Sequence, residues 1–130
     1  MASPGTGGTA PAGISTGDFN NDGYLDLAIA NDGSNDVSIM LNLGNGNFSV
    51  SSPLIIGGND VYTFDKDNDG DLDLIVHKQE LNQISIANND GNGNFSLIST
   101  LTINNLVGFK PSDFDNDGDI DLAVMKDRQG

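Results

Sequence analysis

Apolar and polar residues alternate over short stretches of this chain, and such stretches recur along it. Three of them each place three large apolar side chains on one face of a predicted strand. These residues are Leu25, Leu27 and Ile29, then Leu72, Leu74 and Val76, then Ile120, Leu122 and Val124. Apolar residues never recur at helical spacing over three turns. The pattern predicts an all-β chain with these nine side chains in its core.

Further strands are predicted between these stretches. A turn at Asn45-Gly46 separates two of them. The predicted strands contain Val37, Ile39 and Leu41, then Ile84 and Ile86, and span residues 48–56, 61–64 and 95–103. Each unit therefore contains about four strands.

A repeat organises these strands. Asp18, Asp65 and Asp113 begin near-identical segments, 47 and 48 residues apart. A second landmark, Asn45 to Ser49, recurs 47 residues later as Asn92 to Ser96. Four antiparallel strands in roughly 47 residues match the blade of a β-propeller.

The repeats predict about 2.5 blades, at 13–59, 60–107 and, in part, 108–130. Residues 1–12 are small and rich in Gly, which indicates a flexible linker or an artificial start. Propellers need about four to eight blades, so we expect either a fragment of a larger ring or closure by assembly. With about ten strands per chain, two copies together would have about twenty strands, enough for five four-stranded blades. This favours a homodimer.

The chain is strongly acidic. The net charge is −14, from 19 acidic and 5 basic residues, and 13 of the acidic residues lie in the three repeated Asp segments. Such a charge repels nucleic acids and anionic lipids and attracts cations. The absence of Cys excludes thiolate metal sites and disulfides. No apolar run is long enough for a membrane span or a signal peptide.

The three Asp segments have the pattern of calcium loops, D-x-[DN]-x-D-G-x-x-D. Positions one, three, five and nine supply side-chain oxygens, Gly at position six allows a sharp turn, and position seven offers a backbone carbonyl. These predict about three Ca²⁺ per chain. The predicted ligands are Asp18, Asn20, Asp22, Tyr24 and Asp26; Asp65, Asp67, Asp69, Asp71 and Asp73; and Asp113, Asp115, Asp117, Asp119 and Asp121.

Two other interpretations of these loops compete with calcium binding. An EF-hand needs Glu at position twelve, where this chain has Ile29, Val76 and Val124. A single loop of this kind could be an Asx-rich turn that binds nothing. Three copies in register argue against that alternative, because clustered carboxylates repel one another unless a cation is bound.

The sequence does not predict an enzyme. His77 is the only histidine, and no Ser or Thr lies in a nucleophile motif. The aromatic residues allow two interpretations, stacking on sugar rings or packing between blades, and the second is more common. They are Tyr24, Tyr62, Phe19, Phe64, Phe109 and Phe114.

The three Asp loops, the Asp-Leu pairs that end them and the Gly-Asn-Phe landmarks at Phe48 and Phe95 resemble FG-GAP/VCBS-type repeats. Relatives of this kind form the calcium-binding blades of integrin α-subunit propellers and of some lectins. The resemblance implies a propeller, a secreted or extracellular location, and a lectin-like or cell-adhesion role with a carbohydrate or protein ligand.

Three hypotheses about function follow. The first is a calcium-stabilised binding module. The second is an architectural propeller piece that self-assembles and has no ligand beyond calcium. The third is an accessory domain of a secreted enzyme whose catalytic residues lie elsewhere in a longer protein.

Overall fold

The computed structural model describes residues 8–51 and 53–128, and within these residues the chain is all-β, as predicted. The only helical element there is a single 3₁₀ turn, η1 (Gln79–Leu81). The strands are β1 (Pro11–Gly17), β2 (Asp26–Asn31), β3 (Asp36–Asn42), β4 (Phe48–Val50), β5 (Asp60–Phe64), β6 (Asp73–Lys78), β7 (Gln83–Asn89), β8 (Phe95–Thr102), β9 (Leu106–Ser112) and β10 (Asp121–Lys126).

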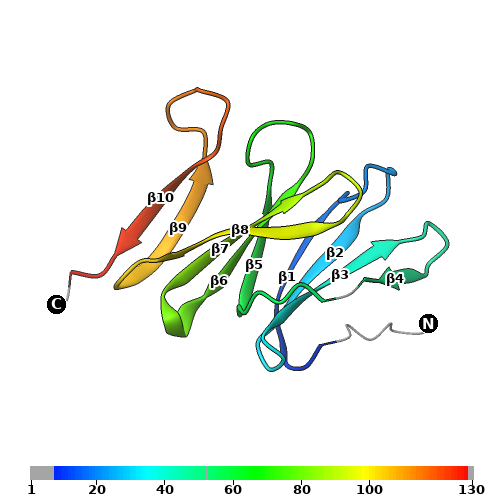
Figure 1. Cartoon of the computed structure of the whole chain (residues 1–130), viewed down its shortest axis with the longest axis horizontal. Coiled ribbons are helices and arrows are strands. Elements are labelled where there is room, and N and C mark those ends of the chain that lie inside the picture. Colours follow the sequence, from blue (N-terminus) through cyan, green and yellow to red (C-terminus); the bar gives the residue numbers. More distant parts are fainter. Residues whose placement is uncertain (1–7, 52, 129–130) are drawn as a thin grey trace.

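The strands form three antiparallel sheets that lie side by side like the vanes of a fan (Figure 1). Blade 1 has the strand order β1-β2-β3-β4 and blade 2 the order β5-β6-β7-β8, while the described part of blade 3 consists of β9 and β10. Each four-stranded sheet is thus a meander in which consecutive strands pair. Propeller blades have this topology.

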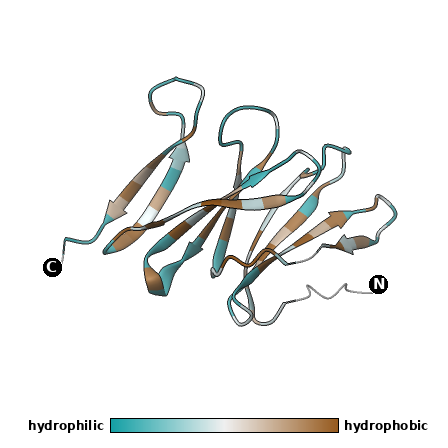
Figure 2. Cartoon of the chain, in the orientation of Figure 1, coloured by the Kyte–Doolittle hydropathy of each residue, from teal (hydrophilic) through white to brown (hydrophobic). Residues whose placement is uncertain are grey.

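Blades 1 and 2 enclose an apolar core. β5 contacts β1 and β2 across the interface between the two sheets. Figure 2 shows the strands rich in hydrophobic residues, whereas the loops that follow β5 and β9 are hydrophilic. The buried residues of this core are Phe19, Ala28, Ala30, Val37, Ile39, Ile56, Val61, Leu74, Val76 and Ala87.

A second cluster joins blades 2 and 3. Ile75, Ile84 and Leu106 are its buried members, and Phe109 packs against them. The Phe109 ring meets the rings of Tyr62 and His77 edge-on, with centroids 5.1 and 5.4 Å apart. Here the aromatic residues pack between blades, which was the more common of the two roles considered for them.

The predicted core was wrong at several positions. Leu25 is 64% exposed, and Val124 is also exposed. The second strand of each blade begins at the last Asp of the loop, so Leu25, Leu72 and Ile120 precede it. Ala28 and Ala30 are buried on the face of blade 1 that meets blade 2. Blade 2 has a neighbour on each side, so Ile75 is buried on its second face.

The predicted strand over 48–56 was also wrong, because β4 ends at Val50. Beyond it, Ser51 bonds the Ile39 carbonyl and Leu54 forms an isolated bridge with Val37. The counterpart strand, β8, runs from Phe95 to Thr102, close to the prediction. β8 is the outermost strand of blade 2, with exposed Leu97, Ile98 and Leu101. At the start of the chain, β1 already includes Pro11 and Ala12 from the expected linker, and residues 1–7 lie outside the described residues.

Candidate metal centre

The three Asp-rich loops connect the first two strands of each blade and project from the same end of the fan (Figure 1). We call residues 18–26 loop 1, residues 65–73 loop 2 and residues 113–121 loop 3. The last loop residue pairs in the sheet with the residue just before the loop: Asp26 with Gly17, Asp73 with Phe64, Asp121 with Ser112. Each loop is therefore closed at its base by the sheet itself.

Two positions in every loop have left-handed backbone geometry. Position six is Gly, with φ of 91°, 93° and 96° in the three loops. Position four is Asn21, Asn68 or Asn116, with φ near 60°. Asn is among the few residues that adopt this geometry readily. Position four was not among the predicted functional positions, although Asn recurs there in all three loops.

The first carboxylate of each loop binds the turn that follows it. In loop 2, Asp65 accepts the backbone N–H of Asp69 at 3.2 Å and that of Gly70 at 3.0 Å. Asp69 in turn accepts the N–H of Asp71 at 2.8 Å. Loops 1 and 3 contain the same three bonds. The three loops thus share one pattern of hydrogen bonds between carboxylates and the turn.

The ninth carboxylate of loops 1 and 2 is buried. Asp26 accepts the N–H of Phe19 at one oxygen and the N–H of Asn42 at the other, both at 2.8 Å. Asp73 accepts the N–H groups of Lys66 and Asn89 in the same way, at 3.0 and 2.9 Å. A carboxylate oxygen that accepts one N–H keeps a further lone-pair site, so both can still serve as cation ligands.

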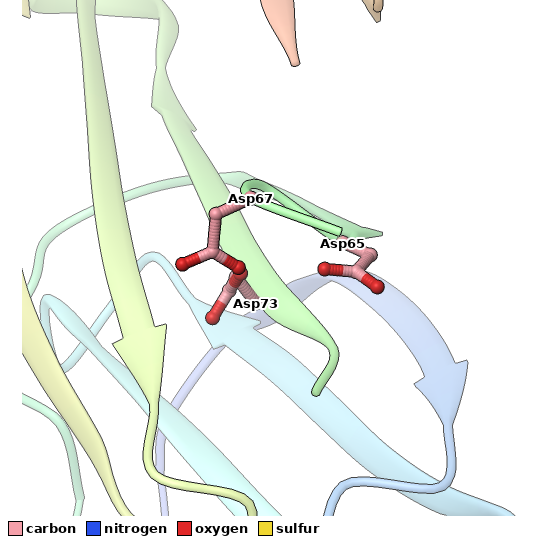
Figure 3. A group of neighbouring side chains, drawn as sticks. All are labelled: Asp65, Asp67 and Asp73. Atoms are coloured by element: carbon pink, nitrogen blue, oxygen red, sulfur yellow. The ribbon is translucent and has the colours of Figure 1, made fainter. Parts of the chain in front are cut away.

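Loop 2 brings three of its predicted ligands together. Oxygen atoms of Asp65, Asp67 and Asp73 lie within 4.8 Å of one another, and their side chains turn toward a common point (Figure 3). Asp69 lies outside this group, and the Asp71 side chain bonds Asn21 of loop 1. Burial raises the pKa of Asp73, and the neighbouring carboxylates Asp67 and Asp69 add to that rise against the opposing effect of the two backbone N–H groups.

Loop 3 gathers a similar but more open set. Oxygens of Asp113, Asp115 and Asp117 lie within 4.8 Å of one another, while Asp121 and Asp119 are not in that group. The N–H of Asp117 stabilises charged Asp115, yet desolvation and the carboxylates of Asp117 and Asp121 raise the pKa of Asp115 overall. Like charges are therefore crowded here as well.

Loop 1 gives independent evidence for a ligand. Asn20, at position three, donates from its Nδ2 to Asp22 at 3.0 Å. Its Oδ1 is buried and has no hydrogen-bond partner. A buried polar atom without a partner is unfavourable by about 1–3 kcal/mol. A cation coordinated by Oδ1 would remove that cost. Among the described residues, however, Asp18, Asp22 and Asp26 do not form a close group like those of loops 2 and 3.

The fold and these loops define the chain as a set of β-propeller blades with an acidic loop on each. Comparison with known families identifies it further: the FG-GAP-like repeat family matches residues 18–76 and again residues 65–124. The chain belongs to this family. Searches of curated proteins and of solved structures found no match. Within residues 8–51 and 53–128, no helix is long and apolar enough to cross a membrane.

Proposed function

We propose that this chain is a calcium-stabilised, non-enzymatic propeller module of an extracellular protein. The observation that carries the proposal is the convergence of Asp65, Asp67 and Asp73 in a loop whose geometry recurs in all three blades. The partnerless Oδ1 of Asn20 supports it independently. About three Ca²⁺ would bind per chain, with the position-seven carbonyls of Tyr24, Asp71 and Asp119 completing each ligand set.

Calcium acts structurally in this proposal. Each loop joins two paired strands, and its ninth carboxylate lies within the sheet, so a cation there fixes the direction of both strands. A ligand that binds only the native state stabilises it by mass action, by about 2.7 kcal/mol at a concentration of 100 Kd. Excess EDTA should therefore lower the melting temperature, and added Ca²⁺ should restore it. An unchanged melting temperature in EDTA would contradict the structural role.

Recognition of a carbohydrate or protein belongs to the proposal as the role of the whole module. A groove of about 480 Å³ between blades 1 and 2 is lined by Ile39, Ser51, Pro53, Leu54, Asn94 and Phe95. Its volume suits a small ligand. A glycan array in calcium, repeated with Asn94→Trp to fill the groove, tests this role. No glycan bound by the parent chain would refute the carbohydrate part.

Self-assembly is the second candidate function, and two exposed side chains favour it. Ile14 in β1 is equivalent in the repeat to Val61, which is buried, and to Phe109, which packs between blades 2 and 3. Ile14 itself is 61% exposed. At the other end of the fan Met125 is 60% exposed, where the equivalent Ala30 is buried. The two ends thus present opposite halves of the blade-to-blade interface, which a second copy can cover.

Light scattering tests this second function directly. We expect a multiple of the 13.6 kDa chain mass, with a dimer as the favoured form, and a shift to monomer in Ile14→Glu. Leu81→Glu, at an exposed position of the central blade outside the three loops, is the matched control and should remain assembled. A parent chain that stays monomeric at high concentration would refute assembly.

A further inference from the structure

The side chain of Asn89 joins the loops of neighbouring blades. It is almost fully buried. Its Nδ2 donates to the carbonyl of Phe19 in loop 1 at 2.7 Å and to that of Leu72 in loop 2 at 3.0 Å. Its Oδ1 accepts the N–H groups of Gly91 and Gly93. All hydrogen-bonding atoms of this amide are therefore used, and it is held in one orientation.

The same residue completes a path between two buried carboxylates. The backbone N–H of Asn89 donates to Asp73 Oδ1 at 2.9 Å. Phe19, whose carbonyl accepts the Asn89 amide, donates its own N–H to Asp26 Oδ2 at 2.8 Å. An unbroken chain of hydrogen bonds and backbone thus runs from Asp26 of loop 1 to Asp73 of loop 2.

A second contact joins the two loops at the surface. Asn21, at position four of loop 1, donates from Nδ2 to Asp71 Oδ1 at 2.9 Å and to the carbonyl of Gly91 at 3.2 Å. Asp71 is the position-seven residue of loop 2. The two loops are thus linked both at the buried base and at the exposed rim.

We propose that loops 1 and 2 bind calcium cooperatively and that Asn89 is the positioning residue that couples them. This inference rests on the proposed calcium binding. Without a cation, crowded carboxylates disfavour the closed loop. Closing loop 2 on a cation fixes Asp73 and Asn89, and hence Phe19 and Asp26, so loop 1 has less conformational freedom left to lose when it binds. Repulsion between the two cations is offset by the net charge of −14.

The repeat supplies a matched control in Asn42, which holds in blade 1 the position of Asn89 in blade 2. Its N–H likewise donates to a ninth carboxylate, that of Asp26, at 2.8 Å. Its side chain, however, bonds only the carbonyl of Leu25 and the N–H of Gly44, both within blade 1. Asn42→Ala therefore removes a similar amide without breaking a contact between blades.

The experiment follows each loop separately by NMR during a calcium titration. The amides of Gly23 and Gly70 report on loops 1 and 2, because each donates to the first carboxylate of its loop. Asp67→Ala weakens loop 2 at an exposed ligand. We expect it also to raise the calcium Kd of loop 1, by about fivefold or more. In an Asn89→Ala background this effect on loop 1 should vanish, whereas Asn42→Ala should preserve it.

Asn21→Gly provides a second test if Asn89→Ala fails to fold, because Asn21 is exposed and Gly tolerates its φ of 60°. It should reduce the coupling between the loops. If neither amide responds to calcium, the proposed calcium function is wrong. If both respond and Asp67→Ala leaves loop 1 unchanged, only the coupling is refuted. Equal effects of Asn42→Ala and Asn89→Ala would overturn the role of Asn89.

Discussion

Phe19 and Phe114 occupy position two of loops 1 and 3 but differ sharply in their surroundings. Phe19 is completely buried between blades 1 and 2, and its ring meets that of Phe95 edge-on with centroids 5.4 Å apart. Phe114 is 57% exposed. Both donate their backbone N–H to the ninth carboxylate of their loop. Substitution by Ala keeps that backbone bond in both cases, so only side-chain packing changes.

The structure sets the expected size of the two effects. Replacing a core Phe by Ala typically destabilises by about 3–5 kcal/mol, and loss of the aromatic pair accounts for about 0.5–1.5 kcal/mol of this. Full burial of a Phe side chain is worth about 1.5–3 kcal/mol. Phe114 buries less than half of its surface, so Phe114→Ala should destabilise by about 1 kcal/mol or less. A small domain is stable by only about 5–15 kcal/mol, so Phe19→Ala removes a large share.

Urea unfolding of both variants in saturating calcium, followed by circular dichroism, measures the difference. The midpoint should fall far more for Phe19→Ala than for Phe114→Ala, with similar dependence on urea concentration. Losses of unfolding free energy within about 1 kcal/mol of each other would refute the assignment of Phe19 to an interface between blades.

Three further predictions follow from individual residues. The hydrogen bond from the Tyr62 hydroxyl to Asp60, at 2.6 Å, raises the pKa of Tyr62 to about 12. Asp60→Asn should lower that pKa toward 10, measured by ultraviolet titration in a Tyr24→Phe background so that Tyr62 is the only tyrosine. An unchanged pKa would contradict this cause. The raised pKa means that the protonated Tyr62 hydroxyl stabilises the folded state. This contribution to the free energy of unfolding should decline as pH rises from about 10 to about 12. We expect loop 1 to be the weakest calcium site, because it has Asn20 where the other loops have Asp. Asn20→Asp adds a carboxylate and should lower the calcium Kd of loop 1 in a per-site titration. A raised Kd would show that Asn20 is not a ligand. Gly70→Ala should lower the free energy of unfolding in urea by about 1–2 kcal/mol through its φ of 93°, since a Cβ there meets no atom within 4 Å, and full stability would contradict that reasoning.

The sequence predicted the repeat, the four-stranded blades and the place of each loop, because Asp and Gly spacing reports local turn geometry directly. It misplaced the start of the second strand because Asp26 and Asp73, though acidic, are buried and satisfied by backbone N–H groups. It also predicted one strand over 48–56, although Pro53 cannot donate to a ladder. Thr100 holds the equivalent position in β8, which is full length.

The role of Asn89 could not be predicted. Its partner Phe19 lies 70 residues earlier in the chain and contributes only a backbone carbonyl, which leaves no mark in the sequence. The partnerless oxygen of Asn20 is likewise visible only in three dimensions, because it depends on what covers that side chain. Contacts between blades therefore had to come from the structure, whereas contacts within a blade followed largely from the repeat.

The exposed edge of β8 affects how readily the protein aggregates. This strand forms the free outer edge of blade 2, and no charged residue occurs from Gly91 to Phe109. An uncharged edge strand with exposed Leu97, Ile98 and Leu101 is a template for pairing with another chain. Mutual repulsion at a net charge of −14 keeps such edges apart, and that repulsion disappears near the isoelectric point of about 4.1. Acidification should therefore produce β-rich aggregates, and a lysine at an outward position of β8 should keep the protein in solution.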